Sequence, residues 1–159
     1  MNEVPRVYVE TSVFGGVFDE EFKRPSDLFF DSIRAGAFEL VVSDVVRREV
    51  AEAPKAVQGL FDEMLGLADV AEVTTAALEL RDAYLEAGVL GQSRVDDALH
   101  VALATVSRCS MIVSWNFRRI VHFDKIPLYC AVNTLLGHGP IGIHSPLEVI
   151  RYGDAEEDV

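Results

Sequence analysis

Long apolar runs are absent from this sequence, because no stretch approaches the roughly 18 to 20 residues that a membrane span needs. The opening residues MNEVPRVYVETS lack the basic and then apolar layout of a signal peptide. We therefore expect a cytoplasmic protein that does not bind membranes. Cysteine is scarce too: Cys109 and Cys130 are the two present, without CxxC or Cys/His spacing. Neither a disulfide framework nor a zinc site is expected, and both residues are predicted to be buried free thiols.

Positive charge is the third scarcity. The 159 residues include 14 Lys and Arg against 26 Asp and Glu, a formal net charge of −12, which is the reverse of what a general nucleic-acid binder carries. Residues 60–90 are strongly acidic, whereas residues 91–125 have a surplus of bases. Residues 151–159 form an acidic stretch that predicts a solvated, mobile tail.

What the sequence does contain is ordinary globular composition, with 50% apolar and 25% charged residues, which excludes a disordered or low-complexity chain. Short β-branched runs alternate with patterns of helical period. Strands are predicted at residues 6–10, 38–42, 70–73, 111–114 and 141–144, and helices at 25–35, 45–53, 56–67, 75–87, 93–108 and 125–136. The segment TSVFGG after the first strand is predicted to be a turn. This alternation predicts a three-layer α/β fold in one domain, residues 1–150, with an open, mostly parallel sheet of four to five strands covered by helices on both faces.

Polar residues at the ends of predicted strands are the first candidates for function, because ligands of such sheets bind outside the carboxyl ends of the strands. Glu10 ends the first predicted strand, and Ser114 and Asn116 end and follow the fourth. Each also has a plain structural interpretation: Glu10 as an acid at a solvated edge and Asn116 as a turn residue.

Glu49 lies within an apolar stripe. Ser43 is a natural N-cap for the helix predicted after it, and helical spacing puts Glu49 on the side that carries Val45, Val46 and Val50. A carboxylate on that side is costly unless it is paired or bound to a cation. The alternative is an acid that extends its head out to water.

The predicted helix over residues 93–108 carries its charge at one end. Ser93 and Asp96 match the S-x-x-[DE] capping box, which gives Asp96 a structural role. The helix dipole favours an acid at Asp97 as well. His100 lies one turn further on the same side, where it is either a base, a partner that supports the acids, or a satisfied core histidine.

Four of these residues come from four different elements that are predicted to open on one edge of the sheet, namely Glu10, Glu49, Asp97 and Asn116. Three carboxylates held close repel one another unless a cation neutralises them, and oxygen ligands suit Mg²⁺ or Mn²⁺ rather than zinc. Such a cation activates water and stabilises the charge that develops on a phosphodiester.

A local basic patch follows these residues, formed by Arg118, Arg119, His122 and Lys125. It is predicted either to hold phosphate groups of RNA or to be a solvated loop.

Taken together, these residues resemble the PIN-domain family, metal-dependent ribonucleases best known as toxins of toxin–antitoxin pairs. The likeness spans almost the whole chain through five segments, VYVETSVFGG, VVSDVVRREV, DDALHVALA, SWNF and IGIHSPLEV. The resemblance implies that Glu10, Glu49 and Asp97 are catalytic metal ligands, assisted by Asn116. It gives supporting roles to Ser12, Ser114, Asp96 and His100. The family usually has Asp where this chain has Glu10 and Asn116.

Three hypotheses follow from the sequence. The leading one is a Mg²⁺- or Mn²⁺-dependent endoribonuclease that acts on RNA and has an antitoxin protein as partner. The second is a catalytically weak or inactive domain that binds protein, either an antitoxin-like partner or a second copy in a homodimer, because the acidic residues 60–90 could receive a basic partner. The third, a phosphatase or nucleotide-binding enzyme, has less support, because the sequence contains no GxxxxGK[ST] loop and no DxD after the first strand.

Overall fold

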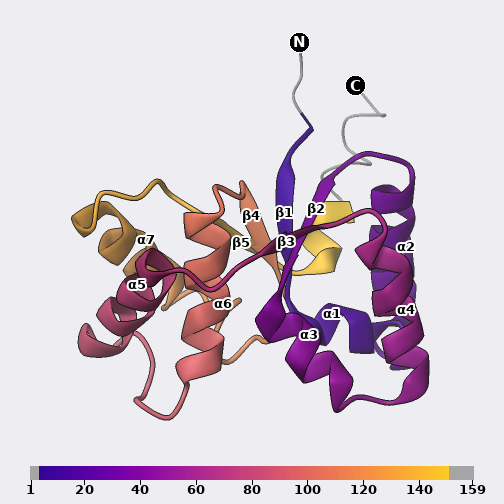
Figure 1. The fold of residues 1–159 in the computed structure, drawn as a ribbon, viewed down its shortest axis with the longest axis horizontal. Helices are drawn as coiled ribbons and strands as arrows, with labels where there is room; N and C mark the ends of the chain where they lie inside the picture. The colour runs from indigo at the N-terminus through magenta and orange to yellow at the C-terminus, as the bar shows by residue number, and fades with distance from the viewer. Residues whose placement is uncertain (1–3, 151–159) are drawn as a thin grey trace.

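Strands and helices alternate along the chain (Figure 1), and the computed structural model describes residues 4–150. The strands are β1 (Arg6–Val9), β2 (Glu39–Ser43), β3 (Asp69–Ala71), β4 (Met111–Val113) and β5 (Gly142–His144). The helices are α1 (Thr11–Gly16), α2 (Lys23–Arg34), α3 (Asp44–Ala51), α4 (Lys55–Leu65), α5 (Thr75–Glu86), α6 (Val95–Val106) and α7 (Ile126–Leu135). The acidic tail predicted at residues 151–159 lies outside the described residues.

The five strands form one sheet in the order β3-β2-β1-β4-β5, and all of its pairings are parallel. The chain runs outward from β1 to β2 and β3, then returns to place β4 and β5 on the other side of β1. Since parallel crossovers are right-handed, this reversal puts α1 to α4 on one face and α5 to α7 on the opposite face (Figure 1). The predicted open sheet with helices on both faces is therefore confirmed, and the strand order reverses between β1 and β4.

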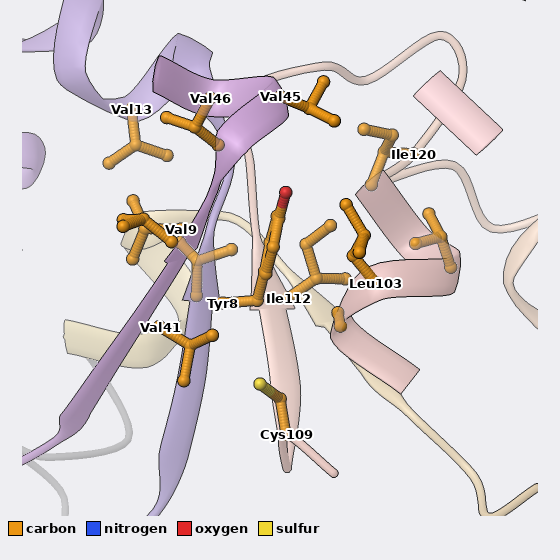
Figure 2. Packing of buried hydrophobic residues seen from close by; sticks show 14 of the residues in the cluster. Tyr8, Val9, Val13, Val41, Val45, Val46, Leu103, Cys109, Ile112 and Ile120 are labelled. Atoms are coloured by element: carbon orange, nitrogen blue, oxygen red, sulfur yellow. The ribbon is translucent and has the colours of Figure 1, made fainter. Parts of the chain in front are cut away.

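The core is built around the central strand. Val7, Tyr8 and Val9 of β1 are fully buried, as expected for a strand covered on both faces. Figure 2 shows the ring of Tyr8 among apolar side chains, with Leu103 of α6 nearby. The hydroxyl of Tyr8 points toward the start of α3. The hydroxyl of Tyr8 therefore lies within the apolar core and is directed toward the carboxyl edge of the sheet.

The segment TSVFGG forms the helix α1, so the predicted turn is wrong. The side chain of Glu10 caps this helix by accepting the N–H of Ser12. A Cβ at Gly16 would lie 2.6 Å from the Ser26 hydroxyl and 2.7 Å from Nε1 of Trp115, so glycine allows α1 to approach these side chains closely. The cap from Glu10 and the close packing at Gly16 therefore stabilise a helix whose residues have low helix propensity.

In α2, Leu28 is exposed, whereas Phe30 packs inward against Phe14 with ring centroids 5.1 Å apart. One prediction about burial needs correction. Cys109 is buried as predicted, and burial raises the pKa of its thiol to about 12, whereas Cys130 is only partly buried. Among residues 4–150, no helix combines the length and apolar character needed to cross a membrane.

Candidate active site

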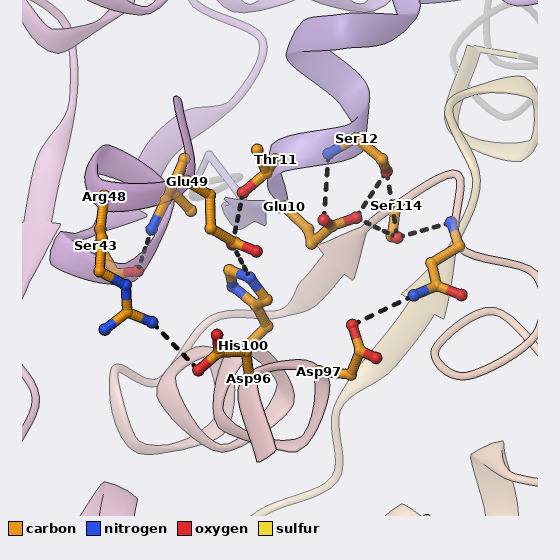
Figure 3. A network of polar contacts seen from close by, with 12 residues as sticks. Glu10, Thr11, Ser12, Ser43, Arg48, Glu49, Asp96, Asp97, His100 and Ser114 are labelled. Atoms are coloured by element: carbon orange, nitrogen blue, oxygen red, sulfur yellow. Dashed lines mark hydrogen bonds and ion pairs between the residues drawn. The ribbon is translucent and has the colours of Figure 1, made fainter. Parts of the chain in front are cut away.

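The carboxyl ends of β1 and β4 are joined through Glu10, the first residue after β1 (Figure 3). Its Oε1 accepts hydrogen bonds from the hydroxyls of Ser12 and Ser114, each at 2.6 Å, and its Oε2 accepts the N–H of Ser12 at 3.0 Å. Glu10 is only 6% exposed. Its carboxylate thus lies where the strand order reverses, which is the usual place for a ligand site in such sheets.

Ser12 and Ser114, to which the family resemblance gives supporting roles, extend this network. The backbone N–H of Trp115 donates to the Ser12 hydroxyl oxygen at 2.9 Å, and the N–H of Asn116 donates to that of Ser114 at 2.9 Å. The two hydroxyls therefore connect the carboxylate of Glu10 to the chain that leaves β4.

Glu49 reaches the same edge from α3. Ser43 caps this helix as predicted, with its side chain accepting the N–H of Val46. Oε1 of Glu49 accepts a hydrogen bond from Thr11 Oγ1 at 2.8 Å and lies 2.5 Å from Nε2 of His100. Burial favours the neutral acid, but the hydrogen bond and charge of His100 outweigh it, so the net effect lowers the pKa of Glu49. The predicted cost of a carboxylate on this side is offset by pairing.

His100 is both a core histidine and a partner of an acid. It is 1% exposed, and its Nδ1 lies 2.7 Å from the Tyr8 hydroxyl, which in turn lies 2.7 Å from Oγ of Ser43. Burial opposes the charged imidazolium, but the hydrogen bond to Glu49 and the surrounding carboxylates outweigh it and raise the pKa of His100. A buried chain of polar groups therefore fixes the ring that holds Glu49.

Asp97 enters the edge from the first turn of α6. Its Oδ1 accepts a hydrogen bond from Nδ2 of Asn116 at 3.3 Å, and its Oδ2 lies 3.7 Å from Nε of Arg119. Burial raises the pKa of Asp97, and the negative charges of Glu10 and Glu49 raise it further. Two of the acids that the sequence grouped together therefore act electrostatically on the third.

Other predicted residues lie apart from this arrangement. Asp96 is exposed and pairs with Arg48 at 3.1 Å, and the predicted capping box is wrong because Arg94 is the N-cap of α6 and its side chain makes no capping hydrogen bond. Lys125 donates a hydrogen bond from Nζ to the carbonyl of Val89 at 2.9 Å.

The two arginines of the predicted patch differ in position. Arg118 is exposed, whereas Arg119 is half-buried beside Asp97. Arg119 is therefore the basic residue of the patch that directly contacts an acid of the edge.

Thr11 and Tyr8 also contact the residues of this edge, although neither was predicted to do so. Thr11 directly follows Glu10, and Tyr8 precedes Glu10 by two residues, the spacing that puts side chains on the same side of a strand. That spacing was the available signal for Tyr8.

The oxygen atoms at this edge fit a hard divalent cation, because they belong to carboxylates, which repel one another, and to the amide of Asn116. Their spacing is wider than a compact cage: within residues 4–150, no three His, Cys, Asp or Glu side chains are grouped closely enough to hold a metal ion. Protein hydrogen-bond donors hold the three carboxylates instead.

No family model and no curated protein matches this chain. Its fold is similar to a chain in the crystal structure of VapBC2 from Rickettsia felis bound to a DNA fragment from their promoter. The TM-score is 0.55 and the sequence identity 11%, and the match covers 87% of this chain and 98% of that chain. At this identity the likeness concerns the fold, and it supports the PIN-like α/β architecture that the sequence predicts.

Proposed function

We propose that this chain is a PIN-domain endoribonuclease that hydrolyses RNA phosphodiester bonds with Mg²⁺ or Mn²⁺, as the toxin of a toxin–antitoxin pair. The observation that carries the proposal is the meeting of Glu10, Glu49 and Asp97 at one edge, where burial and then the negative charges of the other two acids raise the pKa of Asp97. Acids that raise the pKa of a neighbour are stabilised when a cation binds among them. The family resemblance and the fold shared with a chain of VapBC2 give further support.

In this proposal, the carboxylates of Glu10, Glu49 and Asp97 would turn from their present hydrogen-bond donors to hold the cation. When bound, the cation supplies positive charge that activates water and stabilises the charge developing on the phosphodiester. His100 and Thr11 orient the Glu49 carboxylate through their hydrogen bonds to Oε1.

Two further residues act on Asp97. Asn116 orients it through Nδ2, and Arg119 stands close enough to exchange this carboxylate for a phosphate oxygen of RNA.

The test uses two neighbouring acids that differ in their surroundings. Purified protein is incubated with labelled single-stranded RNA in EDTA, Mg²⁺ or Mn²⁺, beside Asp97→Asn and Asp96→Asn prepared in the same way. We expect cleavage that requires a divalent cation, disappears in Asp97→Asn and persists in Asp96→Asn, since Asp96 pairs with Arg48. Equal activity of wild type and Asp97→Asn would show that the site is misassigned.

A second candidate function, a catalytically weak domain that binds a protein partner, is favoured by a different observation. Glu10 accepts three hydrogen bonds from Ser12 and Ser114, so its carboxylate already has a structural role. A correctly folded wild-type protein that cleaves no RNA in either metal, and binds a partner through the acidic residues 60–90, would favour this candidate.

A further inference from the structure

We propose that the aromatic loop, residues 115–125, binds single-stranded RNA by stacking unpaired bases on Phe117 and Phe123. The proposal rests on the proposed function, and it names the part of the molecule that would hold the bases of the substrate.

The two rings are exposed although the surrounding loop is folded onto the protein. Phe117 is 46% exposed and Phe123 is 80% exposed. The ring of His122 stacks on that of Phe123 with centroids 5.4 Å apart and an angle of 11° between the planes. Two flat rings therefore reach the surface, one of them supported by a second ring, as in platforms that stack bases without reading their sequence.

The loop begins at the candidate active site. Asn116 and Arg119 both contact Asp97, so Phe117 and Arg118 lie between two residues that touch this acid. Phe123 follows Arg119 by four residues, which limits the distance between their backbones to about 14 Å. A strand stacked on both rings would thus pass close to the acids.

Buried groups hold the base of the loop in place. The carbonyl of Asn116 accepts the N–H groups of Ile120 and Val121, and Ile120 is fully buried. The hydroxyl of Tyr129 donates to the carbonyl of Arg119 at 2.7 Å. Since the loop is already ordered, presenting the rings to a ligand costs little additional conformational entropy.

The charge of the loop fits a polyanion. In a chain with a net charge of −12, the loop contains the bases Arg118, Arg119 and Lys125 and the single acid Asp124. Phosphates are attracted to this local surplus and repelled by the acidic remainder, which favours an RNA strand over the loop. Exposed rings beside positive charge and beside the candidate active site fit RNA better than an acidic protein.

The experiment measures binding without cleavage. Fluorescence anisotropy in EDTA compares a labelled single-stranded RNA with a strand of the same length that carries abasic sites, so the two probes differ in bases and share the same phosphates. We expect the wild type to bind the strand with bases more tightly. Phe117→Ala and Phe123→Ala should each weaken its binding about 5- to 150-fold, with little effect on the abasic strand.

Two controls separate stacking from charge and from general damage. Leu135→Ala removes an apolar side chain of α7 that is 82% exposed, and it should bind as the wild type does. Arg118→Ala should reduce the slope of log affinity against log salt by about one, whereas Phe117→Ala and Phe123→Ala should leave the slope unchanged.

Equal affinity of wild type for both probes, or unchanged affinity in both Phe variants, would overturn the proposal. Absence of RNA binding, with Phe117→Ala and Phe123→Ala instead changing the oligomeric state in size-exclusion chromatography, would overturn it in favour of a protein contact. Failure of the two proposals is distinguishable: base-dependent binding without cleavage in any metal refutes the nuclease alone, whereas cleavage with base-independent binding refutes the aromatic loop alone.

Discussion

Removing one buried hydroxyl, in Tyr8→Phe, would test the polar chain that runs from the core to Glu49. The Tyr8 side chain is fully buried, and its hydroxyl lies 2.7 Å from Ser43 Oγ and 2.7 Å from Nδ1 of His100. Burial raises the pKa of Tyr8 well above its ordinary value, so the hydroxyl keeps its proton at working pH. The variant keeps the ring and removes both hydrogen bonds.

The expected cost follows from these two contacts. A hydrogen bond contributes a net 0.5 to 1.5 kcal/mol, and Nδ1 of His100 would be left buried without its partner, so the free energy of unfolding should fall by about 2 kcal/mol. For a domain of this size that corresponds to a fall in Tm of about 4 to 8 °C. Because His100 holds Glu49, RNA cleavage should fall as well.

Urea denaturation measures the stability of Tyr8→Phe, and Tyr84→Phe is its matched control. Tyr84 is also fully buried, but its hydroxyl donates to Asn133 rather than to a group of the candidate site. The control should lose about 1 kcal/mol and keep its rate of RNA cleavage. A loss below about 0.5 kcal/mol in Tyr8→Phe would refute the buried chain, and equal loss of cleavage in both variants would refute its link to Glu49.

Three further predictions concern pH and backbone geometry. The pKa of His100 is raised and that of Glu49 lowered in the folded protein. The stabilisation that the His100–Glu49 pair gives to the folded protein is therefore lost as pH rises through the raised pKa of His100. It is also lost as pH falls through the lowered pKa of Glu49. In EDTA the free energy of unfolding should fall above about pH 6.5, and His100→Gln should remove that fall in urea titrations. Arg108 has a φ of 59°, so Arg108→Gly should raise the free energy of unfolding by about 1 kcal/mol, whereas Arg108→Ala should give no gain. Gly16→Ala should lower the free energy of unfolding by about 1 to 3 kcal/mol, because its Cβ would lie 2.6 Å from another side chain. Gly15→Ala, with nothing within 4 Å of its Cβ, should cost less in the same urea denaturation experiment.

Much of the fold could be predicted from the sequence, because strands such as Arg6–Val9 are rich in β-branched and aromatic residues, and these residue types indicate a buried strand. Helix α1 could not, since TSVFGG is locally unfavourable for helix and depends on the cap from Glu10 and close packing at Gly16. The capping box at Ser93 failed for a related reason: a local motif does not reveal that Asp96 meets Arg48, far along the chain.

The candidate site was predictable in its position and not in its partners. Strand ends and helical spacing place Glu10, Glu49 and Asp97 at one edge, and the structure brings them to that edge. The donors that hold them come from distant parts of the chain: Ser114 lies 104 residues from Glu10, and Thr11 lies 38 residues from Glu49. Such pairs depend on the three-dimensional arrangement, which periodicity along the sequence does not contain.

The strand order has a consequence for the protein during its synthesis. Glu10 and Glu49 leave the ribosome early, whereas Asp97 and Ser114 follow only after the first three strands have emerged. Because β4 pairs with β1, the early acids meet the late ones only when nearly three quarters of the chain has been made. A nascent or prematurely terminated chain that lacks β4 therefore lacks an assembled site, so the fold itself delays any activity of this edge until β4 has been made.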